Sequence, residues 1–379
     1  MPNNLSKLGL LVFSIVAISL TADAYSVTNS YPHNLNAALD YYGFKKPEQK
    51  QAIRFLMRES GIQDVDSLLD GNIADKNALI QKILDFVSAT QNKFTIRTGS
   101  QERWDIETAK WMKDPVRQAQ ILAALETLGI MDAVPPIFEK RAAICILGAT
   151  KKTMAARLEY AGNLYVEDKL SAEWLIMLAG ERYVTPDKNG DALDGSKQEL
   201  ILLANKIGKN ISALTETDLM RAEYESSKLY GRFPNHEVLI DTPKRDLPRP
   251  TTETTIMALC DWLQQHPEVQ SITFVSNQPH VEYQKNIIAQ VFVKRAMQVN
   301  FEVIGDKYQI DLENNIADKI NYIIQALGSS IWAATPKVIH DIGLDVSDKE
   351  LMAKYLDLYK KQPLIYNNLY SKLIAKPKL

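Results

Sequence analysis

The spacing of apolar residues changes twice along the chain. Between residues 25 and 135, apolar residues recur three or four positions apart, which gathers them into one stripe on each of several α-helices. Residues 136–310 instead alternate uninterrupted apolar runs of strand length with helical segments. From residue 311 to residue 379 the helical spacing returns. The pattern predicts an N-terminal all-α module, a central α/β domain and a C-terminal helical appendage.

Five apolar runs in the central region have the length of buried strands. Helical segments separate the runs, and parallel strands connected by helices become covered on both faces. The runs span residues 142–147, 174–179, 237–240, 271–276 and 300–304. We therefore predict an α/β fold with a Rossmann-like, doubly wound and mainly parallel sheet.

The first 24 residues have the pattern of a secretory signal peptide. Lys7 supplies a positive charge, residues 8–20 are uncharged and mostly apolar, and Ala22 and Ala24 are the small residues that a signal peptidase requires before Tyr25. Because the apolar run is shorter than the roughly 20 residues that cross a bilayer, cleavage is favoured over an uncleaved anchor. We expect an exported protein, periplasmic or secreted, with peripheral envelope association as a further option.

Composition and charge narrow the class of protein. Hydrophobic residues make up 46% of the chain and charged residues 24%, as in globular proteins. The 44 basic and 46 acidic residues nearly cancel, so no positive excess is available for phosphate backbones, and we expect no nucleic-acid partner. Cys145 and Cys260 both lie in apolar segments, which favours two buried thiols over a disulfide.

The turns after the apolar runs are where a ligand is expected. Ligands of open parallel sheets bind in the crevice outside the carboxyl ends of the strands. The candidate residues at these turns are Gly148, Ala149, Gly180, Arg249, Thr251, Glu253, Ser276 and His280. They bring together glycine turns, one cation, hydroxyl groups, a carboxylate and an imidazole.

Three of these residues indicate an anionic ligand and proton transfer. Gly148 allows backbone N–H groups to approach an anion, Arg249 supplies a cation, and His280 titrates near neutral pH. Structural alternatives remain, because a turn can require the glycine, Thr251 and Glu253 suit the start of a helix, and a histidine can lie at the surface. The chain lacks the three spaced glycines of a dinucleotide fingerprint, so bound NAD is not supported. We expect no metal ion, and the sequence identifies no cofactor.

The order of these motifs resembles the SanA/YdcF family, a bacterial envelope group of unknown function. The resemblance covers about residues 142–304. It rests on the strand and turn at 144–148, the helix at 157–165, the turn at Gly180, Glu216 with Met220, the run from Arg249 to Thr254, and Ser276 with His280. Pro250 and Thr254 stand where the family has asparagines, Tyr283 where it has an arginine, and Ala149 where it has a second glycine.

Two hypotheses about function follow. In the first, the pocket binds an anionic or nucleotide-like small molecule and catalyses hydrolysis or group transfer on it. Arg249 and the turn amides then hold the anion, Glu216 or Glu253 orients a polar group, and His280 acts as acid or base. In the second, favoured by the replaced motif residues, the α/β core is a scaffold and the helical additions bind a protein partner. The sequence leaves both open.

Overall fold

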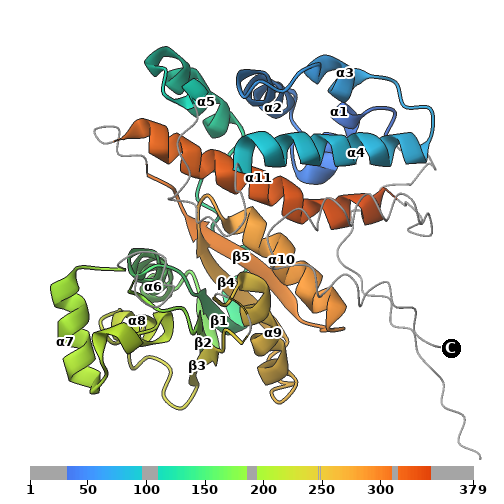
Figure 1. Ribbon diagram of the computed structural model, residues 1–379. Helices are drawn as coiled ribbons and strands as arrows, with labels where there is room; N and C mark the ends of the chain where they lie inside the picture. Colours follow the sequence, from blue (N-terminus) through green and yellow to red (C-terminus); the bar gives the residue numbers. More distant parts are fainter. Residues whose placement is uncertain are drawn as a thin grey trace, which may run out of the picture. The chain divides into compact units, whose positions relative to one another are not determined.

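The computed structural model describes residues 32–95, 110–185, 194–245, 247, 249–309 and 315–342, and Figure 1 gives their arrangement. The predicted signal peptide lies outside the described residues, as does the end of the predicted C-terminal appendage. Everything below concerns the compact unit that begins at Pro32.

The core of this unit is a sheet of five parallel strands. They are β1 (Lys140–Leu147), β2 (Ser171–Gly180), β3 (Glu237–Thr242), β4 (Ser271–Asn277) and β5 (Asn300–Asp306). Their spatial order is β3-β2-β1-β4-β5, and every neighbouring pair is parallel. The strand order reverses beside β1, as in a Rossmann fold, so the predicted fold class is confirmed.

Helices cover both faces of the sheet. α6 (Lys151–Val166) and α8 (Glu216–Glu225) pack on one face, and α9 (Thr252–Leu263) and α10 (Val281–Lys294) on the other. Successive strand residues point to opposite faces, so an uninterrupted apolar run supplies side chains to both helical layers. This double burial is why the strands read as continuous apolar runs. Both cysteines are buried and free, as predicted.

α7 (Lys197–Ile207) is a helix that the apolar spacing did not predict. It begins at a capping box in which the side chains of Ser196 and Glu199 each accept a backbone N–H of the other residue. Only Leu200 and Ala204 of this helix are buried, so its apolar stripe is too narrow to stand out from a polar loop. The short 3₁₀ helix η6 (Ile211–Ala213) connects α7 towards α8.

The N-terminal region forms the predicted helical module. Its elements are α1 (Leu35–Ala38), η1 (Leu39–Tyr42), α2 (Pro47–Glu59), α3 (Val65–Asp70), α4 (Lys76–Thr90), η2 (Gln91–Thr95), η4 (Lys110–Met112) and α5 (Pro115–Thr127). Proline at the first position of α5 suits a helix start, and Gly129, with φ +72°, ends the segment in the left-handed conformation.

α11 (Ile316–Asp341) joins the helical module to the sheet domain. It packs on α4, α5 and η2 of the module and on α10 of the sheet domain. In Figure 1 it runs between the module and the sheet domain. Gln91 Nε2 donates to Gly328 O at 2.7 Å on one side, and Gln290 Nε2 donates to Ala333 O at 2.6 Å on the other. None of the helices in the described ranges is both long and apolar enough to cross a membrane.

Candidate functional site

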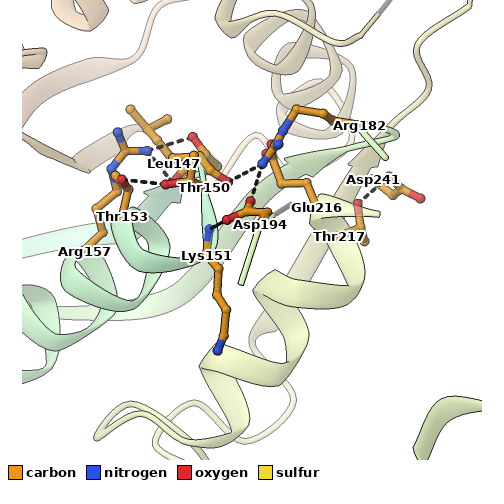
Figure 2. Close-up of polar contacts among 12 residues, drawn as sticks. Leu147, Thr150, Lys151, Thr153, Arg157, Arg182, Asp194, Glu216, Thr217 and Asp241 are labelled. Carbon is orange, nitrogen blue, oxygen red and sulfur yellow. Dashed lines mark hydrogen bonds and ion pairs between the residues drawn. The ribbon is translucent and has the colours of Figure 1, made fainter. Parts of the chain in front are cut away.

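The turn after β1 is held by two buried arginines. Arg157 Nη1, from α6, donates to Leu147 O at 2.7 Å and to Gly148 O at 2.8 Å. Arg182 Nη2, from the segment after β2, donates to Ala149 O at 3.0 Å (Figure 2). Three consecutive carbonyl groups therefore face two guanidinium groups, which fixes the turn and puts positive charge beside it.

Arg182 also makes a buried ion triad at this edge of the sheet. Its Nε lies 2.8 Å from Glu216 Oε2, and its Nη2 lies 2.8 Å from Asp194 Oδ2. The other oxygen of Asp194 accepts the backbone N–H of Lys151 at 2.8 Å, at the start of α6 (Figure 2). A carboxylate of the chain thus uses one N–H of the helix N-terminus, so a ligand anion has to use the turn amides before it.

Gly148 is required by the close approach of Glu216. A Cβ atom at Gly148 would lie 2.1 Å from Glu216 Oε1 and 2.6 Å from Leu178 O. Neither distance is compatible with a side chain, so only glycine allows the carboxylate to reach the turn. The sequence analysis expected this glycine to admit an anionic ligand, whereas in the structure the group that approaches it is the side chain of Glu216.

Three guanidinium groups act on the buried carboxylate of Glu216. Burial raises the pKa of Glu216 above its ordinary value. The guanidinium groups of Arg182, Arg157 and Arg249 oppose that shift, so all three act electrostatically on the same carboxylate. Of the three, Arg182 makes the ion pairs with Glu216 and Asp194 described above.

Arg157 makes no hydrogen bond to a carboxylate among the described residues. Besides the turn carbonyls it bonds Asn277 Oδ1, from Nε at 3.0 Å and from Nη2 at 2.7 Å, so all its hydrogen-bond acceptors are neutral oxygens. Burial lowers the pKa of Arg157 to about 10, and nearby Tyr322 and Glu216 oppose the shift. The guanidinium is still protonated at neutral pH, in a place where water does not screen it.

His280 is held at the same edge by the C-terminal helix. Its Nε2 lies 2.6 Å from Tyr322 Oη of α11, and the two rings meet edge to face at 5.2 Å. Tyr308 stacks on the far side of this pair, 5.8 Å from the ring of Tyr322. The backbone N–H of His280 donates to Asn277 O at 2.9 Å, next to the amide that binds Arg157. The backbone of His280 is thus linked to Arg157 through Asn277, and its imidazole contacts Tyr322, which acts electrostatically on Arg157.

Three other predicted residues have structural contacts. Ser276 is buried and its hydroxyl hydrogen-bonds Gln284 of α10, beneath the sheet. Thr251 is the N-cap of α9 and accepts the Thr254 N–H at 3.3 Å. Gly180 is needed because a Cβ there would lie 2.6 Å from Pro250 Cγ. Among the described residues, no side-chain hydrogen bond joins Ser276, Thr251 or Gly180 to Gly148 or Glu216.

Glu253 faces the interface between α9 and α10. Its carboxylate lies 3.8 Å from Lys294 Nζ, at the end of α10, and the residue is buried. Burial raises the pKa of Glu253 to about 7, although Lys294 opposes the shift. The structure thus separates this carboxylate from the group around Glu216.

The raised pKa of Glu253 predicts a pH-dependent stability. In the unfolded chain this carboxyl has an ordinary pKa of about 4.5, so the folded protein loses stability as the pH rises from there through 7. Glu253→Gln is expected to raise the free energy of unfolding by about 2 kcal/mol at pH 8 and to leave it nearly unchanged at pH 4.5. Urea unfolding at both pH values measures this. Equal stability of parent and variant at pH 8 would contradict a raised pKa.

Sequence reasoning missed part of the cluster. The residues predicted from the sequence do not include Asp194 or Tyr322. Arg157 enters that prediction only as the first residue of the helical segment 157–165. A charged residue inside an apolar helical stripe, as Arg157 is between Met154 and Leu158, was the available signal. Among the described residues, no group of three or more His, Cys, Asp or Glu side chains is placed to hold a metal ion.

Fold and site together define the class. The chain is a Rossmann-like α/β protein whose parallel sheet ends in a buried, positively charged cluster next to a histidine. No family model matches the chain, and no curated protein matches its sequence.

Proposed function

We propose that the carboxyl edge of the sheet binds an anionic or nucleotide-like small molecule. The observation that carries the proposal is Arg157, a buried cation whose hydrogen bonds all go to neutral oxygens at the turn where parallel sheets bind ligands. Arg249 adds a second, half-buried guanidinium that acts on Glu216. An anion at this edge pairs with the guanidinium of Arg157, and low local dielectric strengthens that interaction.

Catalysis of hydrolysis or group transfer is the second part of the proposal. His280 is the acid or base, since its imidazole lies beside the cluster and hydrogen-bonds Tyr322. Glu216 positions Arg182 and the turn and does not transfer the proton, because its carboxylate is buried in the ion triad. The order of motifs further supports kinship with the SanA/YdcF family, and the N-terminal pattern supports export from the cytoplasm.

Arg249→Ala is expected to weaken anion binding without affecting the fold. Inorganic phosphate and AMP serve as probes in isothermal titration calorimetry. Loss of one charge-assisted hydrogen bond corresponds to about 1.5–3 kcal/mol, or about 10- to 150-fold in Kd. His280→Ala is expected to change Kd by about twofold or less, because proton transfer adds little to ground-state affinity.

Arg245→Ala is the matched control, since it removes the same charge from an exposed residue of the same loop. Thermal melting of all three variants confirms that they fold. The proposal fails if neither probe binds the parent at millimolar concentration, or if Arg249→Ala and Arg245→Ala have the same effect on Kd.

A further inference from the structure

A groove lies on the opposite side of the cluster from His280, between α7, α8 and the edge strand β3. Its volume is about 380 Å³. Leu203 and Ile207 of α7 and Leu239 of β3 form its apolar part, and Arg221 of α8 lies on its rim. In Figure 1, α8 lies between α7 and the strands, so α7 extends outward past the sheet. The groove is therefore the space beside β3 that a further strand would fill.

The outer edge of β3 is unpaired within the described residues. β3 ends the strand order and pairs only with β2. The carbonyl groups of His236 and Thr242 point to β2, where they accept the N–H groups of Leu175 and Glu181 at 2.9 Å. Because backbone groups alternate along a strand, those of Glu237, Leu239 and Asp241 point outward.

The same alternation directs the side chains of Glu237, Leu239 and Asp241 towards α8. Thr217 Oγ1, at the start of α8, donates to Asp241 Oδ1 at 2.6 Å (Figure 2), and Tyr224, near its end, hydrogen-bonds Glu237. α8 therefore runs antiparallel over β3, and Arg221, halfway between these two contacts, lies level with Leu239.

The charged residues of the groove differ in how they are paired. Lys206 pairs with Glu225 at 2.6 Å and Lys209 with Asp218 at 2.6 Å. Arg221 is exposed and makes no ion pair or hydrogen bond through its side chain in the described part of the chain. An acid, a cation and an acid therefore follow one another along β3: the exposed Glu237 at its start, beyond the groove, and then Arg221 and Asp241 in the groove lining.

We propose that β3 binds an extended segment of a partner protein as a sixth strand. The segment pairs with the outward backbone groups of Glu237, Leu239 and Asp241, and its groove-facing residues follow the pattern basic, any residue, acidic, any residue, basic. The acidic residue meets Arg221, with its methylene groups against Leu203 and Leu239. The two basic residues lie opposite Glu237 and Asp241.

Charge argues against a second copy of this chain in the groove. Antiparallel self-pairing about Leu239 sets Glu237 opposite Asp241 of the copy, twice. If the pairing is centred on Glu237 or on Asp241 instead, that acid lies opposite the same acid of the copy. Like charges directly opposite each other destabilise a strand pair, so every such register is disfavoured.

The test uses two seven-residue, fluorescein-labelled peptides and the 379-residue chain. One peptide is Val-Lys-Val-Glu-Val-Lys-Val, and the other has Lys and Glu exchanged. The first is expected to bind at least about tenfold more tightly in fluorescence anisotropy, because three cross-strand charge pairs change sign between the peptides. In amide NMR spectra, binding is expected to shift Glu237, Leu239 and Asp241 more than Val238 and Ile240.

Arg221→Glu is expected to weaken binding of the first peptide about tenfold or more, whereas Arg232→Glu, an exposed change of the same charge outside the groove, leaves it unchanged. Backbone N-methylation of the central three peptide residues is expected to abolish binding. Equal affinity for both peptides, undiminished binding of the methylated peptide, or amide shifts elsewhere than β3 would each overturn the proposal. These outcomes do not depend on anion binding at the other site.

Discussion

Arg182→Met is expected to lower the free energy of unfolding by about 3–5 kcal/mol, the cost of removing one partner from a buried ion pair. Glu216 and Asp194 each lie 2.8 Å from the guanidinium and are almost inaccessible to solvent. Without Arg182, two carboxylates remain buried with no hydrogen-bonded cation. Ala149 O also loses its donor. Methionine fills a similar volume, so the loss reports charge rather than a cavity.

The pH dependence of this loss identifies its cause. Burial already raises the pKa of Glu216, and removing Arg182 takes away a group that opposes the rise. When folding raises the pKa of a carboxyl group, the folded protein loses stability as the pH increases through that pKa. The destabilisation by Arg182→Met is therefore expected to be smaller at pH 5 than at pH 8 in urea unfolding followed by circular dichroism.

Arg117→Met is the matched control. Arg117 pairs with Glu59 at 2.5 Å, but 46% of its side chain is exposed, so the change is expected to cost about 1 kcal/mol or less. If Arg182→Met is no more destabilising than Arg117→Met, or if its effect is the same at pH 5 and pH 8, the buried triad does not contribute as described.

Gly148→Ala is expected to destabilise the protein by about 3 kcal/mol, at the upper end of what overpacking by a single methyl group costs. The new Cβ would lie 2.1 Å from Glu216 Oε1 and 2.6 Å from Leu178 O. The carboxylate is held by Arg182, and the carbonyl belongs to the backbone of β2, so neither can move away cheaply. The turn itself must shift, which also disturbs its bonds to Arg157.

Gly162→Ala provides the comparison for the same chemical change. Gly162 lies within α6, where alanine is favoured by about 1 kcal/mol over glycine. Its new Cβ would come within 3.0 Å of Lys228 Cβ, a contact that a shift of a few tenths of an ångström in this exposed residue relieves. We expect Gly162→Ala to be close to neutral in the same urea titration. A Gly148→Ala variant as stable as the parent would contradict the close packing of Glu216 on the turn.

Arg182→Met and Gly148→Ala, compared with variants of Arg249 and His280, also separate a loss of folding stability from a loss of binding alone. Both act on the cluster through Glu216, whereas Arg249 and His280 lie at its half-buried margin. Variants of the margin are expected to melt like the parent and to change ligand binding or turnover, whereas variants of the interior are expected to lower the melting temperature. Melting curves and calorimetry on Arg182→Met, Gly148→Ala, Arg249→Ala and His280→Ala make this distinction.

The location of the central strands could be predicted from the sequence because they are largely buried on both faces. In β1, this burial removes polar residues from consecutive positions, and such a run is visible without knowledge of the neighbours. The limits of α5 were visible for a similar reason, since Pro115 and Gly129 act through the backbone alone. The carboxyl edge as the place for a site followed from the parallel topology.

Other features depended on partners distant in the chain. Ser276 was predicted to follow a strand but lies inside β4, and the pleat turns its hydroxyl under the sheet to Gln284. Glu253 and Glu216 both begin helices, yet one faces Lys294 and the other Arg182. Which carboxylate joined the site was decided by how the helices pack, and no local pattern records that.

The sequence by itself determined the class of fold, the strand positions and the sheet edge at which chemistry is expected, because these follow from local apolar burial and chain geometry. Only the tertiary structure decided which charges meet. A buried arginine is stable only with acceptors supplied by other elements, as Asn277 of β4 does for Arg157, and Tyr322 reaches His280 from 42 residues away. Burial of a charge is a property of the assembled neighbours, so it appears only when they are in place.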